Sequence, residues 1–250
     1  MNELLLAASV VVIFGAALLA YHLFGKAGLF VVSACASILA NIEATMLIVG
    51  FGVEQTLGNV LFAVTFLITD ILSECETKKD AKTAVYCGVF ASAFFLVLNQ
   101  SWLLYTPSPN DGVMDSVQVV FGSTPRLLLS SLTVYAVSQA FDVWLYHKWW
   151  AFTEKKTGSH RAMLWVRNTG STLVSQIINT LLFTLLAFWG TYDFGTIVSI
   201  FLSSYVIFIF TSILDTPAVY WARKIKDRHH DNVVLGKESE GTEPLPSPER

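Results

Sequence analysis

The chain has 250 residues, of which 54% are hydrophobic and only 14% are charged, whereas an ordinary soluble domain carries about 25% charged residues. This composition argues against a soluble enzyme. With 16 Lys and Arg residues against 19 Asp and Glu residues, the formal net charge is -3, which leaves no basic surplus for binding nucleic acid. The three cysteines, Cys35, Cys75 and Cys87, have no CxxC or Cys/His spacing, so neither a disulfide framework nor a zinc site is expected.

Seven runs of mostly apolar residues are long enough, at about 20 residues, to cross a bilayer as helices. They cover residues 4–24, 29–51, 57–72, 84–105, 127–146, 170–189 and 197–221. The third run is the weakest, because it is short and ends among Asp70, Glu74 and Glu76, so a bundle of six spans is the alternative. Since every backbone polar group in lipid needs an internal hydrogen bond, the spans are expected to be helices. The sequence therefore predicts an all-α fold, a polytopic membrane helical bundle.

Lysines and arginines before residue 229 lie on alternate connections between these spans. The connections after the first, third, fifth and seventh spans hold 13 of them, which are Lys26, Lys78, Lys79, Lys82, Lys148, Lys155, Lys156, Arg161, Arg167, Arg223, Lys224, Lys226 and Arg228. The other connections hold only Arg126. Because positively charged loops stay on the cytoplasmic side, the amino terminus is expected outside the cell and the carboxyl terminus inside.

The chain divides into residues 1–228, predicted to form a transmembrane helical domain, and residues 229–250. The second part is polar, contains Pro244, Pro246 and Pro248, and has no apolar periodicity. Such a segment cannot bury enough apolar surface to fold, so a disordered cytoplasmic tail is expected. Residues 105–125 form the one long external connection and are expected to be a loop.

Ionisable side chains within spans are costly in lipid and by default mark a functional path. In the third span, Asp70 and Glu74 lie one helical turn apart on one face. Two carboxylates so close together favour the binding of a proton or a cation. The alternative is that both residues end the helix in the headgroup region, beside Lys78 and Lys79.

Spans five and six carry further polar side chains. Gln139 and Asp142 are three residues apart in span five, and span six contains a polar stripe that includes Asn168, Gln176 and Asn179. Such a stripe must face protein or a cavity. An amide can read the mixed donor and acceptor edge of a heterocycle, and a carboxylate can accept two N–H groups from a guanine-like edge. The candidate substrate-binding residues are therefore these five side chains of spans five and six and the two carboxylates of the third span, Asp70 and Glu74.

Four charged residues are candidates for coupling or gating: Glu43, Arg126, Arg167 and Asp215. Glu43 in the second span and Asp215 in the last have no partner that the sequence identifies. Arg126, the sole external cation, is either an interfacial anchor or a residue that reaches an external vestibule and pairs with Glu43. No catalytic residue, metal site or cofactor is expected, because the chain has no G-x-S-x-G sequence and no histidine deep in a span to activate a nucleophile.

Four short strings in the predicted spans resemble the queuosine precursor transporter family. They are ITDILSE at 68–74, SQAFDV at 138–143, RN at 167–168 followed by STLVSQ at 171–176, and LDTP at 214–217. Their order and spacing match from about residue 57 to residue 224. The resemblance implies an integral protein of the plasma (inner) membrane that takes up a 7-deazaguanine, such as 7-cyano-7-deazaguanine, for the modification of transfer RNA.

For such a transporter, we expect alternating access around a polar site between spans three, five and six, with an unassigned Phe or Trp stacked on the substrate ring. The family is similar in fold to the substrate-binding components of energy-coupling vitamin uptake systems. The alternative function is therefore a substrate-binding subunit for another small heterocycle or vitamin. A separate ATPase partner would energise it, because this chain has no phosphate-binding loop. The expected partners are the lipid bilayer and a small heterocyclic substrate, and not nucleic acid.

Overall fold

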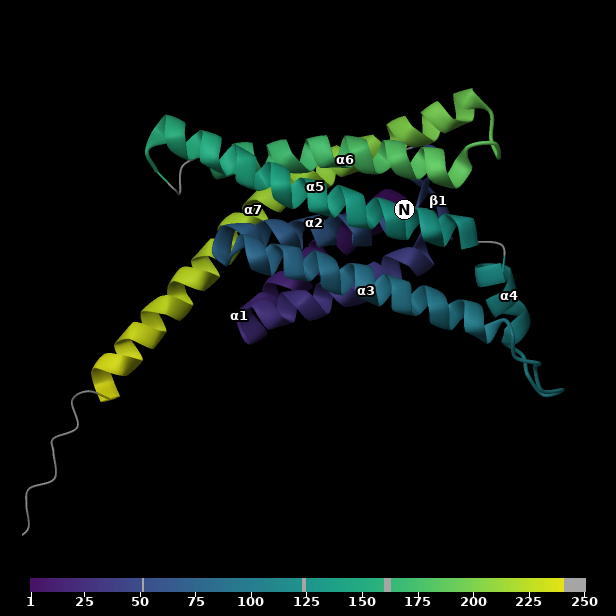
Figure 1. Ribbon diagram of the computed structural model, residues 1–250, viewed down its shortest axis with the longest axis horizontal. Helices are drawn as coiled ribbons and strands as arrows, with labels where there is room; N and C mark the ends of the chain where they lie inside the picture. The colour runs from purple at the N-terminus through teal and green to yellow at the C-terminus, as the bar shows by residue number, and fades with distance from the viewer. Residues whose placement is uncertain (51, 123–124, 160–162, 241–250) are drawn as a thin grey trace, which may run out of the picture.

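The computed structural model describes residues 1–50, 52–122, 125–159 and 163–240. Its elements are α1 (Asn2–Glu43), β1 (Leu47–Gly50), β2 (Val53–Thr56), α2 (Gly58–Cys75), α3 (Lys78–Trp102), α4 (Met114–Gly122), α5 (Pro125–Thr157), α6 (Leu164–Phe188) and α7 (Phe194–Glu240). The long helices lie side by side in one bundle (Figure 1). The predicted all-α helical bundle is confirmed.

The helix α1 consists of two arms that fold back on each other at Gly25. This residue has φ 59° and ψ -147°, a conformation that glycine adopts far more readily than any other residue. Near the bend the backbones of the two arms are in close contact at Gly28. Any side chain there would collide with the other arm, since a Cβ atom on Gly28 would lie 2.3 Å from the carbonyl oxygen of Ala20. At the far end, the side-chain amide of Asn2 donates to the carbonyl of Val49 at 2.7 Å. The two arms correspond to the first two predicted spans.

The second predicted span, 29–51, is wrong in its last residues, because the helix ends at Glu43. The chain then forms an antiparallel hairpin, in which Gly50 faces Val53 and Ile48 faces Gln55. The turn contains Gly52 at φ 79°, another backbone conformation that favours glycine. The apolar residues of β1 continue the hydrophobic run of the preceding helix, and a short apolar run does not distinguish a strand from a helix.

Five helices in the described ranges are long and apolar enough to cross a membrane: α1, α2, α3, α6 and α7. The two arms of α1 match two of the predicted spans, and α5 matches the predicted span 127–146. The weakly predicted third span is α2, which is the most enclosed of these helices, with 78% of its apolar window buried. The expected loop at 105–125 is wrong in part, since residues 114–122 form α4.

The two ends of the bundle differ in charge. The Gly25 bend and the α2–α3 and α5–α6 connections lie at one end, here called the basic end, and the hairpin, α4 and the start of α7 lie at the other, here called the hairpin end (Figure 1). At the basic end, Lys26 binds Asp80 at 3.0 Å and Lys226 binds Glu76 at 2.6 Å. Of the predicted cytoplasmic cations, Arg161 lies outside the described residues. The membrane side that each end faces stays a prediction.

The carboxyl-terminal part of α7 continues past the predicted domain boundary at residue 228 to Glu240. Residues 241–250 lie outside the described part of the chain. The division into a transmembrane domain and a disordered tail therefore stays a prediction.

Candidate functional site

A cavity of about 410 Å³ lies in the half of the bundle nearer the hairpin end. Its walls come from the end of α1, the hairpin, the start of α2, and parts of α5, α6 and α7. Two of its lining residues, Leu47 and Tyr192, are 63% and 47% exposed, so the cavity reaches the surface at that end. Its volume is in the range of small-molecule binding sites.

Aromatic rings from two sides of the bundle line this cavity. Phe62 of α2 and Phe208 of α7 form one pair, with ring centroids 6.4 Å apart. Phe183 and Phe188 of α6 form a second group with Tyr192, at centroid distances of 5.8 and 5.6 Å. Flat apolar walls of this kind favour a flat ligand, because aromatic rings stack on one another face to face or edge to face.

Three amide side chains also line the cavity: Gln55, Asn59 and Asn179. Of the predicted substrate-binding residues, Asn179 is the one among the described lining residues. Sequence reasoning missed Gln55 and Asn59, because both lie between the second and third predicted spans or at the edge of the third. The signal that could have found them is an amide pair directly before an apolar run, which is common in proteins and weak alone.

From Asn179, a row of buried polar side chains runs along α6 toward the basic end. Asn179 donates to the side-chain oxygen of Gln176 at 3.1 Å, and Asn168 donates to Thr216 of α7 at 3.3 Å. Between them, Thr172 donates to a carboxylate oxygen of Asp70 at 3.0 Å. The five of these residues that lie on α2 and α6 are all buried, so the predicted stripe on span six faces the bundle interior.

Three aspartates lie in this polar row, Asp70 of α2, Asp142 of α5 and Asp215 of α7, and each is at most 1% exposed. Asp142 and Asp215 are near enough to act electrostatically on Asp70. Within the described residues, one oxygen of Asp70, one of Asp215 and both of Asp142 have no hydrogen-bond partner. Burying an unpaired carboxylate is costly, so these carboxyl groups favour a proton or the N–H groups of a ligand as partners. We call Asp70, Asp142, Asn168, Gln176 and Asp215 the polar track.

Gln139 is not among the described residues that line the cavity. Its amide nitrogen donates to Thr65 at 2.5 Å, and its oxygen accepts from Thr69 at 3.2 Å. Both donor and acceptor are therefore used between α5 and α2. The structure places this predicted substrate-binding residue as a contact between two helices.

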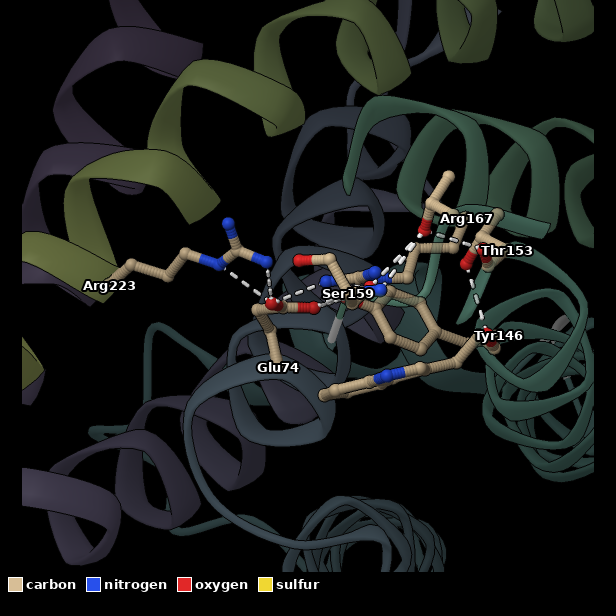
Figure 2. Close-up of polar contacts among 8 residues, drawn as sticks. Glu74, Tyr146, Thr153, Ser159, Arg167 and Arg223 are labelled. Carbon is tan, nitrogen blue, oxygen red and sulfur yellow. Dashed lines mark hydrogen bonds and ion pairs between the residues drawn. The ribbon is translucent and has the colours of Figure 1, made fainter. Parts of the chain in front are cut away.

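Glu74 lies at the centre of an ion-pair cluster near the basic end (Figure 2). It accepts from Arg167 at 2.9 and 2.7 Å, from Tyr146 at 2.6 Å and from the Nε of Arg223 at 2.6 Å. The Arg167 guanidinium also lies over the ring of Trp150, 4.4 Å from its centre. This set, here called the Glu74 cluster, joins α2, α5, α6 and α7. Although Asp70 and Glu74 are one turn apart, they therefore belong to different groups of side chains.

Arg126 anchors the hairpin end. It donates to the carbonyls of Leu186 at 2.8 Å and Trp189 at 2.6 Å, which ties the start of α5 to the end of α6. The predicted pairing of Arg126 with Glu43 is not formed among the described residues, because the Arg126 guanidinium binds these two carbonyls. The alternative of an anchor at the membrane interface stays a prediction. Glu43 is partly buried in the last turn of α1 and forms no ion pair with any residue that the structure describes.

Comparison with known proteins places these features in one family. The family model described as "Putative vitamin uptake transporter" matches residues 56–222. A "Probable queuosine precursor transporter" of Bacillus subtilis (strain 168) is 35% identical over 208 residues, which are 83% of this chain and 89% of that protein. No solved structure matches the chain. The matched range contains α2 to α6, the polar track and all of the Glu74 cluster except Arg223, whereas α1 and β1 precede it.

Proposed function

Because the chain belongs to this vitamin uptake transporter family, we propose that it imports a queuosine precursor, a 7-deazaguanine such as 7-cyano-7-deazaguanine, by alternating access. The chain is a multi-pass transporter of the plasma membrane and not an enzyme. The name of the Bacillus relative supports the substrate class, and the cavity supports the kind of ligand.

The observation that carries the proposal is the continuity between the cavity and the polar track. A 7-deazaguanine has two flat apolar faces and one edge with several hydrogen-bond donors and acceptors. The aromatic lining suits the faces, and the amides suit the edge. Asn179, which lines the cavity and binds Gln176, connects the two regions.

Within the polar track, Asp142 is the strongest candidate acceptor for the substrate. Both of its oxygens lack a hydrogen-bond partner in the described structure, and it is fully buried. A carboxylate in this state can accept two N–H groups from a guanine-like edge. Asn168, Gln176 and Asp70 each also keep an unpaired polar atom for a substrate that moves along the track.

Alternating access requires one open end and one closed end. The cavity reaches the surface at the hairpin end, whereas the Glu74 cluster ties four helices together near the basic end. We therefore assign Arg167 and Glu74 to the closure of the basic end, which must break for release. Asp70 and Asp215, which form no ion pair among the described residues, are the candidates for proton coupling, and Glu74 is not.

The test is uptake of labelled 7-cyano-7-deazaguanine into liposomes that contain only the purified protein. We expect the wild-type protein to transport, Asp142→Asn to lose transport while still inserting, and Asp115→Asn, on exposed α4, to transport normally. Binding is measured in parallel by thermal shift, since a ligand at a hundred times its Kd stabilises by about 2.7 kcal/mol.

The same experiment separates the alternative. Binding without transport in these liposomes would favour a substrate-binding subunit that needs a separate ATPase. Neither binding nor transport of any 7-deazaguanine would refute the proposed substrate class, and normal transport by Asp142→Asn would remove Asp142 from the site.

A further inference from the structure

Gln55 is a buried amide with no internal use. Its side chain is only 4% exposed, and neither its oxygen nor its nitrogen has a hydrogen-bond partner among the residues described. Buried polar groups are nearly always hydrogen-bonded, so an unpaired amide in the wall of a cavity requires an explanation. Gln139, by contrast, is an equally buried amide with both of its polar atoms paired.

The hairpin is built to hold this amide in place. Gln55 faces Ile48 across the strands, and Gly50 lies two residues further along the same face. A Cβ atom on Gly50 would lie 2.4 Å from the Gln55 nitrogen, so the amide packs into the space that the glycine leaves. The antiparallel backbone pairing thus fixes a free donor and a free acceptor at the cavity wall.

Asn59 adds a second free donor beside it. Its oxygen accepts from Thr56 at 3.3 Å, whereas its nitrogen has no partner in the described residues. Asn179, on the other wall, uses its nitrogen on Gln176 and its oxygen on Ser138. The unused hydrogen-bonding capacity of the cavity wall is therefore concentrated on Gln55 and Asn59.

The surroundings of these amides define the ligand. Phe62 is one helical turn after Asn59 on α2, and Phe208 packs against it. None of the described cavity-lining residues is charged. A wall of this kind favours a flat, uncharged heteroaromatic ring with a polar edge, because a net charge would lose its hydration without gaining a partner.

We infer that Gln55 and Asn59 form a recognition site in the cavity for the polar edge of the transported heterocycle, separate from the Asp142 acceptor in the polar track, and that this cavity site selects an uncharged ring. This inference rests on the proposed function and deepens it. It assigns specificity to the hairpin and to the start of α2. The site favours 7-cyano-7-deazaguanine over its aminomethyl relative, which carries a positive charge.

The test is a comparison of Kd values for 7-cyano-7-deazaguanine and 7-aminomethyl-7-deazaguanine with purified protein. We expect Gln55→Ala to weaken binding of the cyano compound about tenfold, since one hydrogen bond of about 1.4 kcal/mol is lost. Gln55→Glu, which keeps the shape of the side chain, should shift the ratio of the two Kd values at least tenfold toward the aminomethyl compound. Gln118→Ala, at an exposed position on α4, is the matched control and should change neither Kd.

The outcomes are distinct. If the wild-type protein binds no 7-deazaguanine, the proposed function fails, and the inference fails with it. If the wild-type protein binds the cyano compound and both Gln55 variants keep its Kd and the ratio within twofold, the inference alone is overturned. The melting temperature of each variant without ligand shows whether it folds, and the isosteric Gln55→Glu keeps the test decisive if Gln55→Ala does not fold.

Discussion

Replacing Glu74 by glutamine should destabilise the protein strongly, because one carboxylate serves two arginines. Its side chain is 3% exposed, and the side chains of Arg167 and Arg223 are 0% and 14% exposed. In Glu74→Gln both guanidinium groups lose their shared anion, and the new amide N–H₂ group points a donor at other donors. Removing one partner of a buried ion pair costs about 3–5 kcal/mol.

The burial of the two arginines sets the size of the effect. Arg223 lies at the rim and can turn toward water, so most of the penalty falls on Arg167, and we expect about 3 kcal/mol for Glu74→Gln. Arg223→Gln leaves Glu74 paired with Arg167 and Tyr146. It should therefore cost no more than about 1 kcal/mol, the usual range of a partly exposed pair.

The assay is thermal unfolding in detergent, followed by intrinsic fluorescence. At about 2–4 °C per kcal/mol for a chain of this size, Glu74→Gln should lower the melting temperature by about 6–12 °C. Glu43→Gln is the control, since Glu43 is partly buried but forms no ion pair in the described structure, and it should melt close to the wild-type protein. A fall of less than 2 °C for Glu74→Gln, or a larger fall for Arg223→Gln than for Glu74→Gln, would refute the reasoning.

Three further predictions concern packing, helix contact and orientation. Gly88→Ala should destabilise the protein by about 1–3 kcal/mol in thermal unfolding, because its Cβ atom would lie 2.0 Å from the hydroxyl of Tyr135; an unchanged melting temperature would contradict this close packing. Gln139→Ala should lower stability by about 1 kcal/mol but change the Kd of 7-cyano-7-deazaguanine less than threefold, since the amide joins two helices; a tenfold change in Kd would return it to the binding site. After replacement of the three native cysteines, a single cysteine at Asn110 should react with a membrane-impermeant maleimide in intact cells and one at Thr157 should not; the reverse pattern would invert the predicted orientation.

The helical part of the fold was predictable because backbone polar groups in lipid need internal hydrogen bonds, which a helix supplies. Apolar runs of sufficient length mark the helices, and each predicted span corresponds to a helix or to one arm of α1. The central helix α2 gave the weakest signal for a physical reason. Thr65, Thr69 and Asp70 face neighbouring helices and not lipid, so they lower the apolar character of the very helix that is most enclosed.

The hairpin and the bend were not predictable from the same pattern. The residues of β1 extend an apolar run, and pairing with β2 depends on a turn and on contacts with α1 that hydropathy does not describe. Gly25 lies between two predicted spans, where a glycine signals a connection but not its angle. Gln55 was missed with the hairpin that carries it.

Within the candidate site, residue spacing predicted which face of each helix points into the bundle, but not which side chains bind one another. The stripe from Asn168 to Asn179 faces the bundle interior, as its spacing indicates. The separation of Asp70 from Glu74 was not foreseen, because the groups that decide it, Arg167 and Arg223, are 93 and 149 residues away in the sequence from Glu74. Long-range contacts of this kind are absent from any local pattern.

The bend at Gly25 makes the first arm of α1 a lever with its pivot at the basic end and its tip at the opposite end. At 1.5 Å per residue the arm is about 33 Å long, so a change of about 10° at the pivot would swing the tip by about 6 Å. That swing exceeds the length of the hydrogen bond from Asn2 to Val49, through which the arm holds β1. The position of the strand that faces Gln55 thus depends on one backbone angle at the opposite end of the molecule, in a segment that precedes residues 56–222, the range that the family model matches.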